Sequence, residues 1–465
     1  MYSSNFNNLI LNSDSYKTSH WLQYPPDSQY MSSYVEARKG DHDVLFFGLQ
    51  AFIKEYLQAP ITTTDIDEAE IVITAHGLPF NRSGWERLVE KHDGYLPVRI
   101  QAVPEGSIVP VSNVVCQIVN TDPEFYWLPS YLETALLRAI WYPSTVASLS
   151  YYCKNVIKSA LEKSADNTDS LPFKLHDFGA RGGSSMETIA LGSLANLVNF
   201  SGTDSMTALV AASRWYGMDK DMPAFSIPAA EHSTMTAWGR ERETQAYANM
   251  LEQFGGEGNL VAVVSDSYDL WNAIDNIWGD TLKDNVENMG GTLVIRPDSG
   301  DPAKVVCEAL TRLAVKFGAT TNSKGYKVLP DYVRLIQGDG INPQSLGKIL
   351  DAVMAAGFSA DNVTFGMGGG LLQQVNRDTM SWAMKASAIC IADTWQDIYK
   401  DPITSQSKRS KKGRLALIKD SNGRLKTIKE DELSAKQDNL LRDVYVDGTL
   451  LIEDTLTTIR KRTGW

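Results

Sequence analysis

The pattern of apolar and polar residues changes character near residue 170 of the 465-residue chain. Before that point, short β-prone runs alternate with helical patterns without a regular rhythm. Leu96 to Val103 and Ile108 to Val119 are rich in β-branched residues, which predicts two paired antiparallel strands. Pro129 to Ile157 repeats apolar residues with few helix breakers, which predicts a helix. The first part of the chain is therefore expected to mix helices and strands.

After residue 170 one unit recurs: a short apolar run, then Gly, Ser or Asp, then a helix-like stretch. The repeats begin at FKLHDFGARGG, LVNFSGTDS, AFSIPAAEHS, LVAVVSDS, TLVIRPDSG, VRLIQGDG and NVTFGMGGG. About seven consecutive βα units are the rhythm of a parallel α/β barrel, whose strand ends meet at the mouth where active sites are built. The ordinary preference for Gly, Ser and Asp at turns and helix caps explains any single loop equally well. That preference does not account for His232, Arg181 or Arg296.

The rhythm stops beyond Lys385. The remaining chain carries a basic stretch, Lys408 to Arg414, and strand-like segments such as RLALI and VYVDGTLLI. We expect this part to return to the first domain. The predicted organisation is an N-terminal domain (1–165), a barrel (166–385) and a C-terminal segment that completes the first domain (386–465).

Composition narrows the function classes. Hydrophobic residues make up 43% and charged residues 22%, as in a globular protein. The net charge of −12 argues against a nucleic-acid partner. The four cysteines show no metal-ligand spacing, and the N-terminus shows no signal-peptide pattern. The most apolar region, Phe125 to Tyr142, is interrupted by charges and a proline, so we expect a buried helix, no membrane span and a cytoplasmic location.

Two glycine motifs fall in the last two predicted units. QGDG ends at Gly340, and FGMGGG spans Phe365 to Gly370. Glycines at a strand-to-helix junction expose backbone N–H groups that suit a phosphate, and barrel enzymes often bind phosphate in their last loops. Close packing of the backbone is the alternative explanation.

Other side chains at the predicted mouth suggest chemistry but leave alternatives open. Asp269 and Asp298 are placed to hold Mg²⁺ or ribose hydroxyls, or to cap helices. His232 is placed to transfer protons, bind phosphate or become phosphorylated, unless it is a core histidine. Phe178 and Arg181 share one loop and suit a flat ring and an anion, although a core role for Phe178 is equally ordinary. The basic stretch Lys408 to Arg414 has three interpretations: a diphosphate-binding segment, a patch like a nuclear-localisation signal, or a solvent-exposed charged face.

Long motifs in a fixed order extend this picture. They are DSYKTSH, FGLQ, HDGYLPV, AVPEG, KLHDFGARGGSS, GTD, PAAEHST, VSDSYD, IRPDSG, IQGDG and KRSKKGR. With them the chain resembles the nicotinamide phosphoribosyltransferases, a family of type II phosphoribosyltransferases, almost from end to end. The resemblance implies an irregular α/β barrel plus an α+β domain made from both ends of the chain, in a homodimer with shared sites. It further implies nicotinamide mononucleotide synthesis for NAD salvage from nicotinamide and 5-phosphoribosyl 1-diphosphate, with Mg²⁺ and with optional ATP hydrolysis through phosphorylated His232.

The same resemblance assigns roles to single residues. Phe178 is expected to stack on nicotinamide and Tyr16 of the partner subunit to cover its other face. Asp204 is expected to accept a hydrogen bond from the carboxamide, which Arg296 orients. Asp298 is expected to bind ribose and, with Asp269, the metal; His232, Asp298 and Arg296 form the expected catalytic set. The remaining expected ligands of ribose and phosphate are Arg181, Arg38, Ser265, Gly338, Asp339, Gly368, Gly369, Arg377, Lys385, Lys400 and Lys408.

Two departures from the family pattern and three rival functions accompany this assignment. Ala383 stands where a family serine is expected, and the chain passes from Arg38 to FGLQ without a longer charged insertion. A nicotinate or quinolinate phosphoribosyltransferase is disfavoured because a substrate carboxylate would meet the like charge of Asp204. A phosphosugar aldolase or isomerase is disfavoured because no lysine occupies a predicted strand end. A non-enzymatic nucleotide sensor is the third rival.

Overall fold

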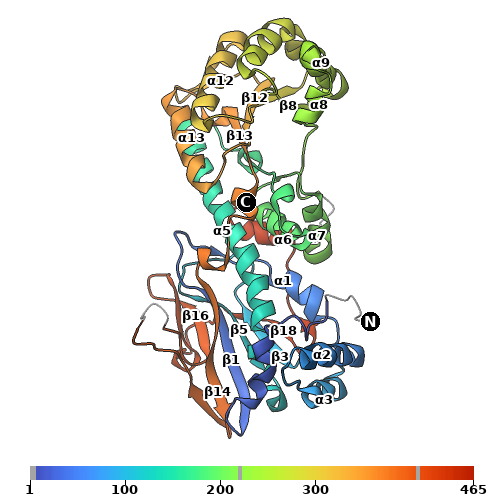
Figure 1. Cartoon of the computed structure of the whole chain (residues 1–465). Coiled ribbons are helices and arrows are strands. Elements are labelled where there is room, and N and C mark those ends of the chain that lie inside the picture. The colour runs from blue at the N-terminus through green and yellow to red at the C-terminus, as the bar shows by residue number, and fades with distance from the viewer. Residues whose placement is uncertain (1–6, 218–221, 405–408) are drawn as a thin grey trace. The chain divides into compact units, whose positions relative to one another are not determined.

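The computed structural model describes residues 7–217, 222–404 and 409–465 (Figure 1). The chain divides into two compact units. The terminal unit comprises Met1–Ser148, Ser213–Gly217 and Asn376–Trp465, so both ends of the chain belong to it. The barrel unit comprises Leu149–Ala212 and Met218–Val375. These bounds differ from the predicted 165 and 385, because one long helix, α5 (Glu133–Ser164), runs through the first boundary without any break in its apolar pattern.

A parallel sheet forms the centre of the barrel unit. Its six strands stand in the order β7-β6-β13-β12-β9-β8, and every neighbouring pair is parallel. The strands are β6 (Leu175–Asp177), β7 (Gly202–Thr203), β8 (Leu260–Val264), β9 (Thr292–Arg296), β12 (Val333–Gln337) and β13 (Val363–Met367).

A seventh segment closes this sheet into a ring. Parallel bridges join Gly202 to Phe225 and Ala229 to Ala262, so residues 225–229 connect the edge strands β7 and β8. Backbone hydrogen bonds from Ala262 to Pro228 and from Ala230 to Ala262 hold the second junction. Six of the seven predicted strands are therefore present, and the seventh segment, AFSIPAA, forms two isolated bridges instead of a regular strand. The predicted α/β barrel class is confirmed.

Helices follow the strands, and their starts follow from the sequence. Asp301 caps α12 and Asn342 caps α13, each with proline at the first helical position, where its missing N–H costs nothing. The helices are α6 (Met186–Leu197), α7 (Met206–Tyr216), α8 (His232–Thr236), α9 (Glu243–Phe254), α10 (Leu270–Asn272), α11 (Lys283–Asn288), α12 (Pro302–Phe317), α13 (Pro343–Ala355) and α14 (Gly369–Leu372).

The barrel interior contains a small apolar cluster of Ala262, Val294 and Ile336, one from each of three neighbouring strands. Phe178 and Ile227 pack against this cluster and are only partly buried. The alternate residues of the same strands, such as Val263 and Ile295, are fully buried. Strands buried on both faces explain why these segments read as continuous apolar runs in the sequence.

The terminal unit is built on an antiparallel sheet in the order β15-β14-β1-β5-β3-β18-β19. Figure 1 shows β1 and β14 side by side, although they come from opposite ends of the chain. The strands are β1 (Ser28–Ala37), β3 (Val98–Ala102), β5 (Val114–Asn120), β14 (Trp382–Ile391), β15 (Thr394–Asp397), β18 (Arg442–Val446) and β19 (Thr449–Leu450). A separate hairpin pairs β16 (Leu415–Lys419) with β17 (Leu425–Lys429).

One strand prediction in this unit needs correction. β3 and β5 pair antiparallel as expected, but Ile108 to Val119 is not one strand. Ile108–Val109 forms a short β4 that pairs with β2 (Val44–Leu45) instead. Pro110 follows at once, and Ser112 takes a left-handed φ of 66°. The chain therefore turns between two strands that share one apolar composition.

Helices complete the terminal unit: α1 (Leu49–Phe52), α2 (Thr63–Ala75), α3 (Arg82–His92), α4 (Leu128–Tyr131), α5 and α15 (Leu456–Arg462). The helix predicted over 129–157 is present as α4 and α5, with Pro143 inside α5. Gly48, with φ of 104°, fits against this proline; a Cβ there would lie 2.3 Å from Pro143 Cγ.

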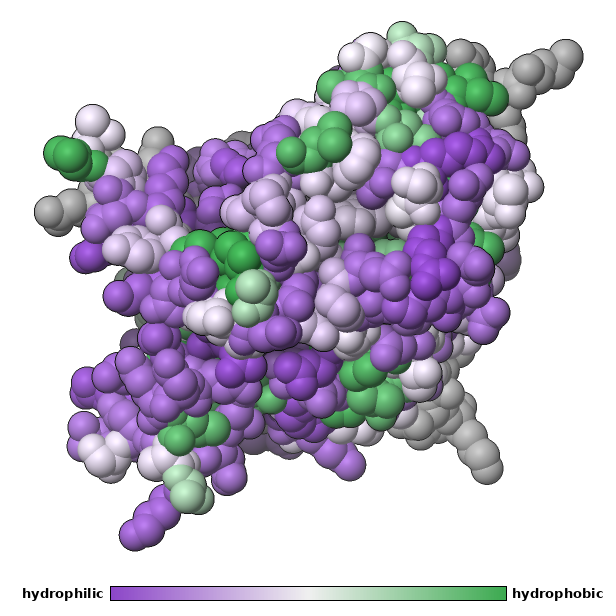
Figure 2. Space-filling model, turned by 90° about the horizontal axis from the view of Figure 1, so that it is seen from below, coloured by the Kyte–Doolittle hydropathy of each residue, from purple (hydrophilic) through white to green (hydrophobic). Residues whose placement is uncertain are grey.

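Among the described residues, no helix has the length and apolar character needed to cross a bilayer. On the face drawn in Figure 2, hydrophobic side chains form small separate groups among hydrophilic ones. The segment from Phe125 to Tyr142 contains α4 and the beginning of α5. It is buried within the terminal unit, and Leu128, Leu136 and Ile140 belong to the core of that unit.

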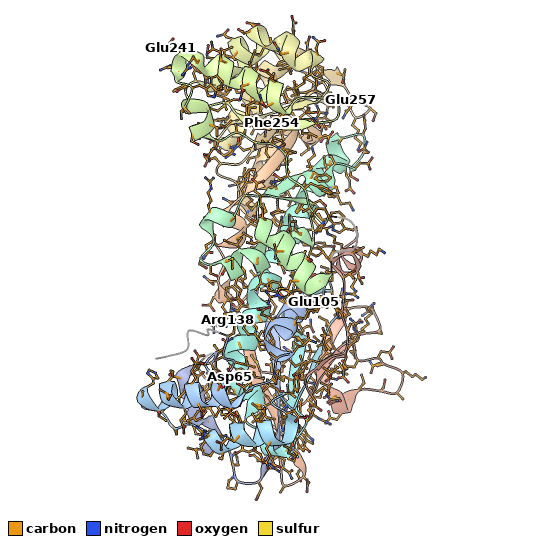
Figure 3. The ribbon with its side chains drawn as sticks, turned by 90° about the vertical axis from the view of Figure 1, so that its right-hand side faces the viewer. Asp65, Glu105, Arg138, Glu241, Phe254 and Glu257 are labelled. Atoms are coloured by element: carbon orange, nitrogen blue, oxygen red, sulfur yellow. The ribbon has the colours of Figure 1, made fainter. Side chains whose placement is uncertain are left out.

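Glu105 of the terminal unit (labelled in Figure 3) is a buried acid that forms no ion pair with any described residue. One of its oxygens accepts a hydrogen bond of 2.7 Å from the backbone N–H of Gln50, beside the start of α1. Burial raises the pKa of Glu105 to about 7 from an ordinary 4.5, and the nearby charge of Asp454 adds to the shift.

We expect this raised pKa to reduce stability as pH rises. Between pH 4.5 and pH 7 the unfolded chain loses the proton first, so wild-type unfolding free energy falls by about 3 kcal/mol relative to Glu105→Gln. Urea denaturation of both proteins at pH 5 and pH 7.5 measures this difference. Parallel pH profiles for the two proteins would show that Glu105 does not titrate in this range.

Candidate active site

The predicted mouth of the barrel centres on Phe178, directly after β6. Its backbone N–H bonds to the Met367 carbonyl at the end of β13. The ring occupies space that two glycines leave open: a Cβ at Gly366 would lie 2.0 Å from Phe178 Cε2, and one at Gly338 would lie 3.2 Å away. The glycines of the two late motifs therefore make room for a partly exposed aromatic ring.

Arg296, the last residue of β9, extends across this ring. Its guanidinium carbon lies 5.3 Å from the centre of Phe178, a cation–π contact. Nη2 donates a hydrogen bond of 2.9 Å to Asp298 Oδ1. Nε is buried and has no hydrogen-bond partner among the described residues. An aromatic face and an unsatisfied donor thus lie side by side.

Asp204 follows β7 and presents a carboxylate at the same edge. Its Oδ1 lies 2.9 Å from His176 Nε2 and accepts a 2.7 Å hydrogen bond from Ser226. Burial raises the pKa of Asp204, but the hydrogen bonds from His176 and Ser226 and the charge of Arg296 lower it further than burial raises it. The pKa therefore lies below the ordinary value, and Asp204 is an anion at neutral pH with Oδ2 left to accept a hydrogen bond.

His232, the first residue of α8, faces two carboxylates. Its Nδ1 lies 3.0 Å from the Ser267 hydroxyl, which leaves Nε2 turned to Asp298 Oδ2 at 3.5 Å and Asp266 Oδ1 at 3.9 Å. The imidazole is half exposed, whereas the Asp266 side chain is almost fully buried. A histidine held in this way is accessible and oriented, not a satisfied core residue.

Asp266 organises the loop after β9. Its Oδ2 accepts hydrogen bonds from the Asp298 backbone N–H (2.9 Å) and the Ser299 hydroxyl (2.6 Å). Its Oδ1 is buried without a hydrogen-bond partner among the described residues. Asp266 thus fixes Asp298 opposite His232.

Two predicted ligands, Ser265 and Asp269, have side-chain oxygens that already form hydrogen bonds within the protein. The Ser265 side chain is fully buried; its hydroxyl donates to the Val263 carbonyl and accepts a hydrogen bond from the Trp278 indole, so a role in substrate binding stays a prediction. Asp269 Oδ1 accepts two backbone N–H bonds at the start of α10, as a helix cap does. No group of three or more His, Cys, Asp or Glu suited to a metal occurs among the described residues.

The other predicted barrel residues lie on loops. Gly338 touches Phe178 as described, and Asp339 is exposed beside it. Gly368 precedes α14 and Gly369 begins it, and a Cβ at Gly369 would meet nothing within 4 Å. Arg181 is exposed on the short helical turn after Phe178. A Cβ at the neighbouring Gly182 would lie 3.9 Å from Gly369, so these two loops adjoin.

In the terminal unit, three of the predicted phosphate ligands share one cavity of about 280 Å³. Arg38, Arg377 and Lys385 line it, and Ala383, which replaces the expected serine, is a further lining residue. Tyr16 is exposed on a short helix (Ser15–Leu22) of this unit. Lys400 is exposed on a loop, and Lys408 lies outside the described residues.

Comparison with known proteins decides the family. The pattern of the nicotinate phosphoribosyltransferase (NAPRTase) family matches residues 173–449, and that of the nicotinamide phosphoribosyltransferase N-terminal domain matches residues 8–100. A protein of Xanthomonas campestris named nicotinamide phosphoribosyltransferase is 52% identical, with 97% of both chains covered. The chain belongs to the nicotinamide phosphoribosyltransferase family. A protein of Acinetobacter baylyi with the same name is 31% identical over 97% of this chain and 95% of its own.

Solved structures of related enzymes share the fold of this family member. Nicotinate-nucleotide pyrophosphorylase from Pyrococcus furiosus matches with a TM-score of 0.62 at 16% identity, covering all of this chain and 96% of its own. Human nicotinic acid phosphoribosyltransferase matches with a TM-score of 0.58 at 16% identity, covering 97% and 92%. At such low identity these matches support the barrel and the additional sheet domain, and not a choice of substrate.

Three polar residues of this site were missed by the sequence reasoning. Asp266 lies in the quoted motif VSDSYD, but only Asp269 of the same motif was named as a candidate. His176 alternates with the buried residues of β6, so it reads as an ordinary strand residue until its hydrogen bond to Asp204 is seen. Ser226 lies in the irregular seventh segment, where no strand pattern marks a strand end.

The contact between Gly366 and Phe178 predicts a selective defect. Gly366→Ala is expected to displace the ring, raise the KM for nicotinamide about tenfold or more, and destabilise the barrel unit by about 1–3 kcal/mol. Steady-state kinetics and thermal unfolding measure the two effects. Gly347→Ala in α13 is the matched control, because its Cβ meets only Val156 at 3.7 Å and should leave the KM unchanged. An unaltered KM in Gly366→Ala would contradict the role of the ring.

Proposed function

We propose that the protein forms nicotinamide mononucleotide and diphosphate from nicotinamide and 5-phosphoribosyl 1-diphosphate, as an enzyme of NAD salvage in the cytoplasm. The observation that carries the proposal is the anionic Asp204 beside the Phe178 ring and Arg296. The ring offers a face for a pyridine, and the carboxylate accepts a hydrogen bond from a carboxamide N–H. A pyridine carboxylate would instead bring a second negative charge to the same place. Family membership supports this assignment.

The chemistry requires positioning more than proton transfer. The pyridine nitrogen of nicotinamide carries no proton, so attack on the ribose carbon needs no general base. The enzyme has to hold the nitrogen behind that carbon and stabilise the departing diphosphate. Asp298, held by Arg296 and by Asp266, is proposed to bind the ribose hydroxyls.

Mg²⁺ and the terminal-unit cations are proposed to neutralise the diphosphate. Mg²⁺ usually takes one or two carboxylates and completes its shell with phosphate oxygens and water, so it does not need a preformed cluster. Asp298 fits this role. Asp269 remains a proposed ligand only through Oδ2, since Oδ1 caps α10. Arg38, Arg377 and Lys385 are proposed to reach the phosphates from the partner subunit of a homodimer, where Tyr16 would cover the nicotinamide ring.

His232 is proposed to accept a phosphoryl group from ATP. The half-exposed imidazole is held through Nδ1 by Ser267, with Nε2 beside Asp298, the proposed ligand of ribose and metal. Hydrolysis of this phosphohistidine would be coupled to mononucleotide synthesis without being required for it.

The identity of the base can be tested at Asp204. Purified enzyme with 5-phosphoribosyl 1-diphosphate and Mg²⁺ should convert nicotinamide, and nicotinate or quinolinate poorly. Asp204→Asn removes the charge but keeps the size, and should lower the nicotinamide-to-nicotinate ratio of kcat/KM by about tenfold to a hundredfold. Product mainly from nicotinate in the wild type would refute the proposal and favour the nicotinate enzyme. No product from any base would favour a sensing function.

ATP coupling can be tested separately at His232. His232→Gln should lose ATP-stimulated synthesis and the acid-labile phosphoryl label from [γ-³²P]ATP, while synthesis without ATP continues. Thr236→Val is a matched control on the same short helix, where the lost hydroxyl bonds only to the His232 carbonyl. Retention of the label in His232→Gln would exclude this residue as the acceptor.

A further inference from the structure

The cavity of the terminal unit adjoins the β1–β14 ladder, with Arg38 directly after β1 and Trp382, Ala383 and Lys385 of β14 among its lining residues. Tyr34 pairs with Lys385 and Glu36 with Ala383, and the Arg38 N–H bonds to the Ser381 carbonyl. Directly paired residues share a face of the sheet, so Glu36 stands on the same side as Ala383. The carboxylate of Glu36 thus lies next to a predicted anion site, two positions before its lining residue Arg38.

Glu36 is almost completely buried, yet it contacts two cations. Its Oε1 lies 3.1 Å from Arg38 Nε, and its Oε2 forms a short ion pair with Lys411 Nζ. Glu36 engages Nε, and the buried Nη2 of Arg38 has no hydrogen-bond partner among the described residues. A guanidinium fixed in this way presents donors that suit a phosphate.

Lys411 ties a second segment to the same carboxylate. Its backbone N–H bonds to the Tyr34 hydroxyl at 2.8 Å, and its Nζ lies 5.9 Å from the centre of the Tyr34 ring. Ser410, the preceding residue, closes the base of the loop that begins at Lys400: the Lys400 N–H bonds to the Ser410 hydroxyl, and the Ser410 N–H bonds to the Lys400 carbonyl. Lys400 is therefore held near β1 through Ser410 and Lys411.

We propose that Glu36 is a positioning residue for diphosphate recognition: it orients Arg38 directly and anchors the Lys400 loop through Lys411. The proposal rests on the proposed function, because it takes Arg38 and Lys400 as phosphate ligands. Glu36 itself does not touch substrate. The negative charge of Glu36 holds Arg38 and Lys411 close together, although these two cations repel each other. The N–H donors of these side chains that do not contact Glu36 remain available to a ligand.

Two substitutions test the proposal in the full-length enzyme. Glu36→Gln keeps the shape but removes the charge, and Lys411→Met removes only the loop anchor. Each should raise the Kd for inorganic diphosphate, measured by calorimetry, and the KM for 5-phosphoribosyl 1-diphosphate about tenfold, and leave the KM for nicotinamide within about twofold. The double variant should be little weaker than Glu36→Gln, because both changes break the same pair.

Glu105→Gln serves as the control, since Glu105 is an equally buried carboxylate of the same unit that does not line the cavity. A merely structural Glu36 would lower the fraction of active enzyme, and so kcat, without changing either KM or the diphosphate Kd. Unchanged diphosphate binding in Glu36→Gln and Lys411→Met would overturn the proposal. Should wild type bind diphosphate but make no mononucleotide, the proposed function fails, and the Kd comparison still decides the role of Glu36. A wild type that binds no diphosphate would overturn both.

Discussion

The site depends on closure of the parallel sheet by residues 225–229. Without the bridges from Phe225 to Gly202 and from Ala229 to Ala262, β7 and β8 would be free edges and their loops would lie apart. Closure brings the loop with Asp204 next to Ser226, and the loop with His232 next to the residues that follow β8. Ser226 lies between the two bridges of this segment and donates a hydrogen bond to Asp204.

Acidic side chains hold the basic ones throughout both units. In the barrel unit, Asp298 holds Arg296 and is itself held by Asp266. In the terminal unit, Glu133 joins the buried Lys17, next to Tyr16, to Lys385 of the cavity. An exposed ion pair adds little to the net stability of a protein, whereas a buried ion pair strongly restricts the orientation of its two side chains. A net negative protein can therefore present ordered cations to an anionic substrate.

The architecture could be predicted from the sequence because each strand–loop–helix unit has a recognisable local order: an apolar run, a Gly, Ser or Asp, and a helix-like stretch. It failed where two segments with the same composition differ in geometry: Ile108–Val109 and β5 read as one strand until Pro110 and Ser112 turn the chain. It placed Phe178, Asp204, His232 and Arg296 at strand ends, and the structure brings these together.

Sequence reasoning could not choose between neighbouring residues of one loop. Asp266 and Asp269 are three positions apart, and only the backbone direction decides which one faces His232 and which one caps α10. Ser265 was named as a ligand, yet its hydroxyl turns to Trp278 in the core. Nor could it pair Gly366 with Phe178, because Gly366 lies in β13 and Phe178 follows β6, and these segments are far apart in the sequence.

Polar atoms without partners mark the same mouth. Three neighbouring strands, β8, β9 and β12, end in a residue or loop with a buried atom that lacks a hydrogen-bond partner among the described residues: Asp266 Oδ1, Arg296 Nε and Gln337 Oε1. A buried atom of this kind costs about 1–3 kcal/mol when it stays unsatisfied, so each of the three favours a bound partner, whether a water molecule or a substrate. A substrate that supplies the missing donors and acceptors would recover that free energy on binding.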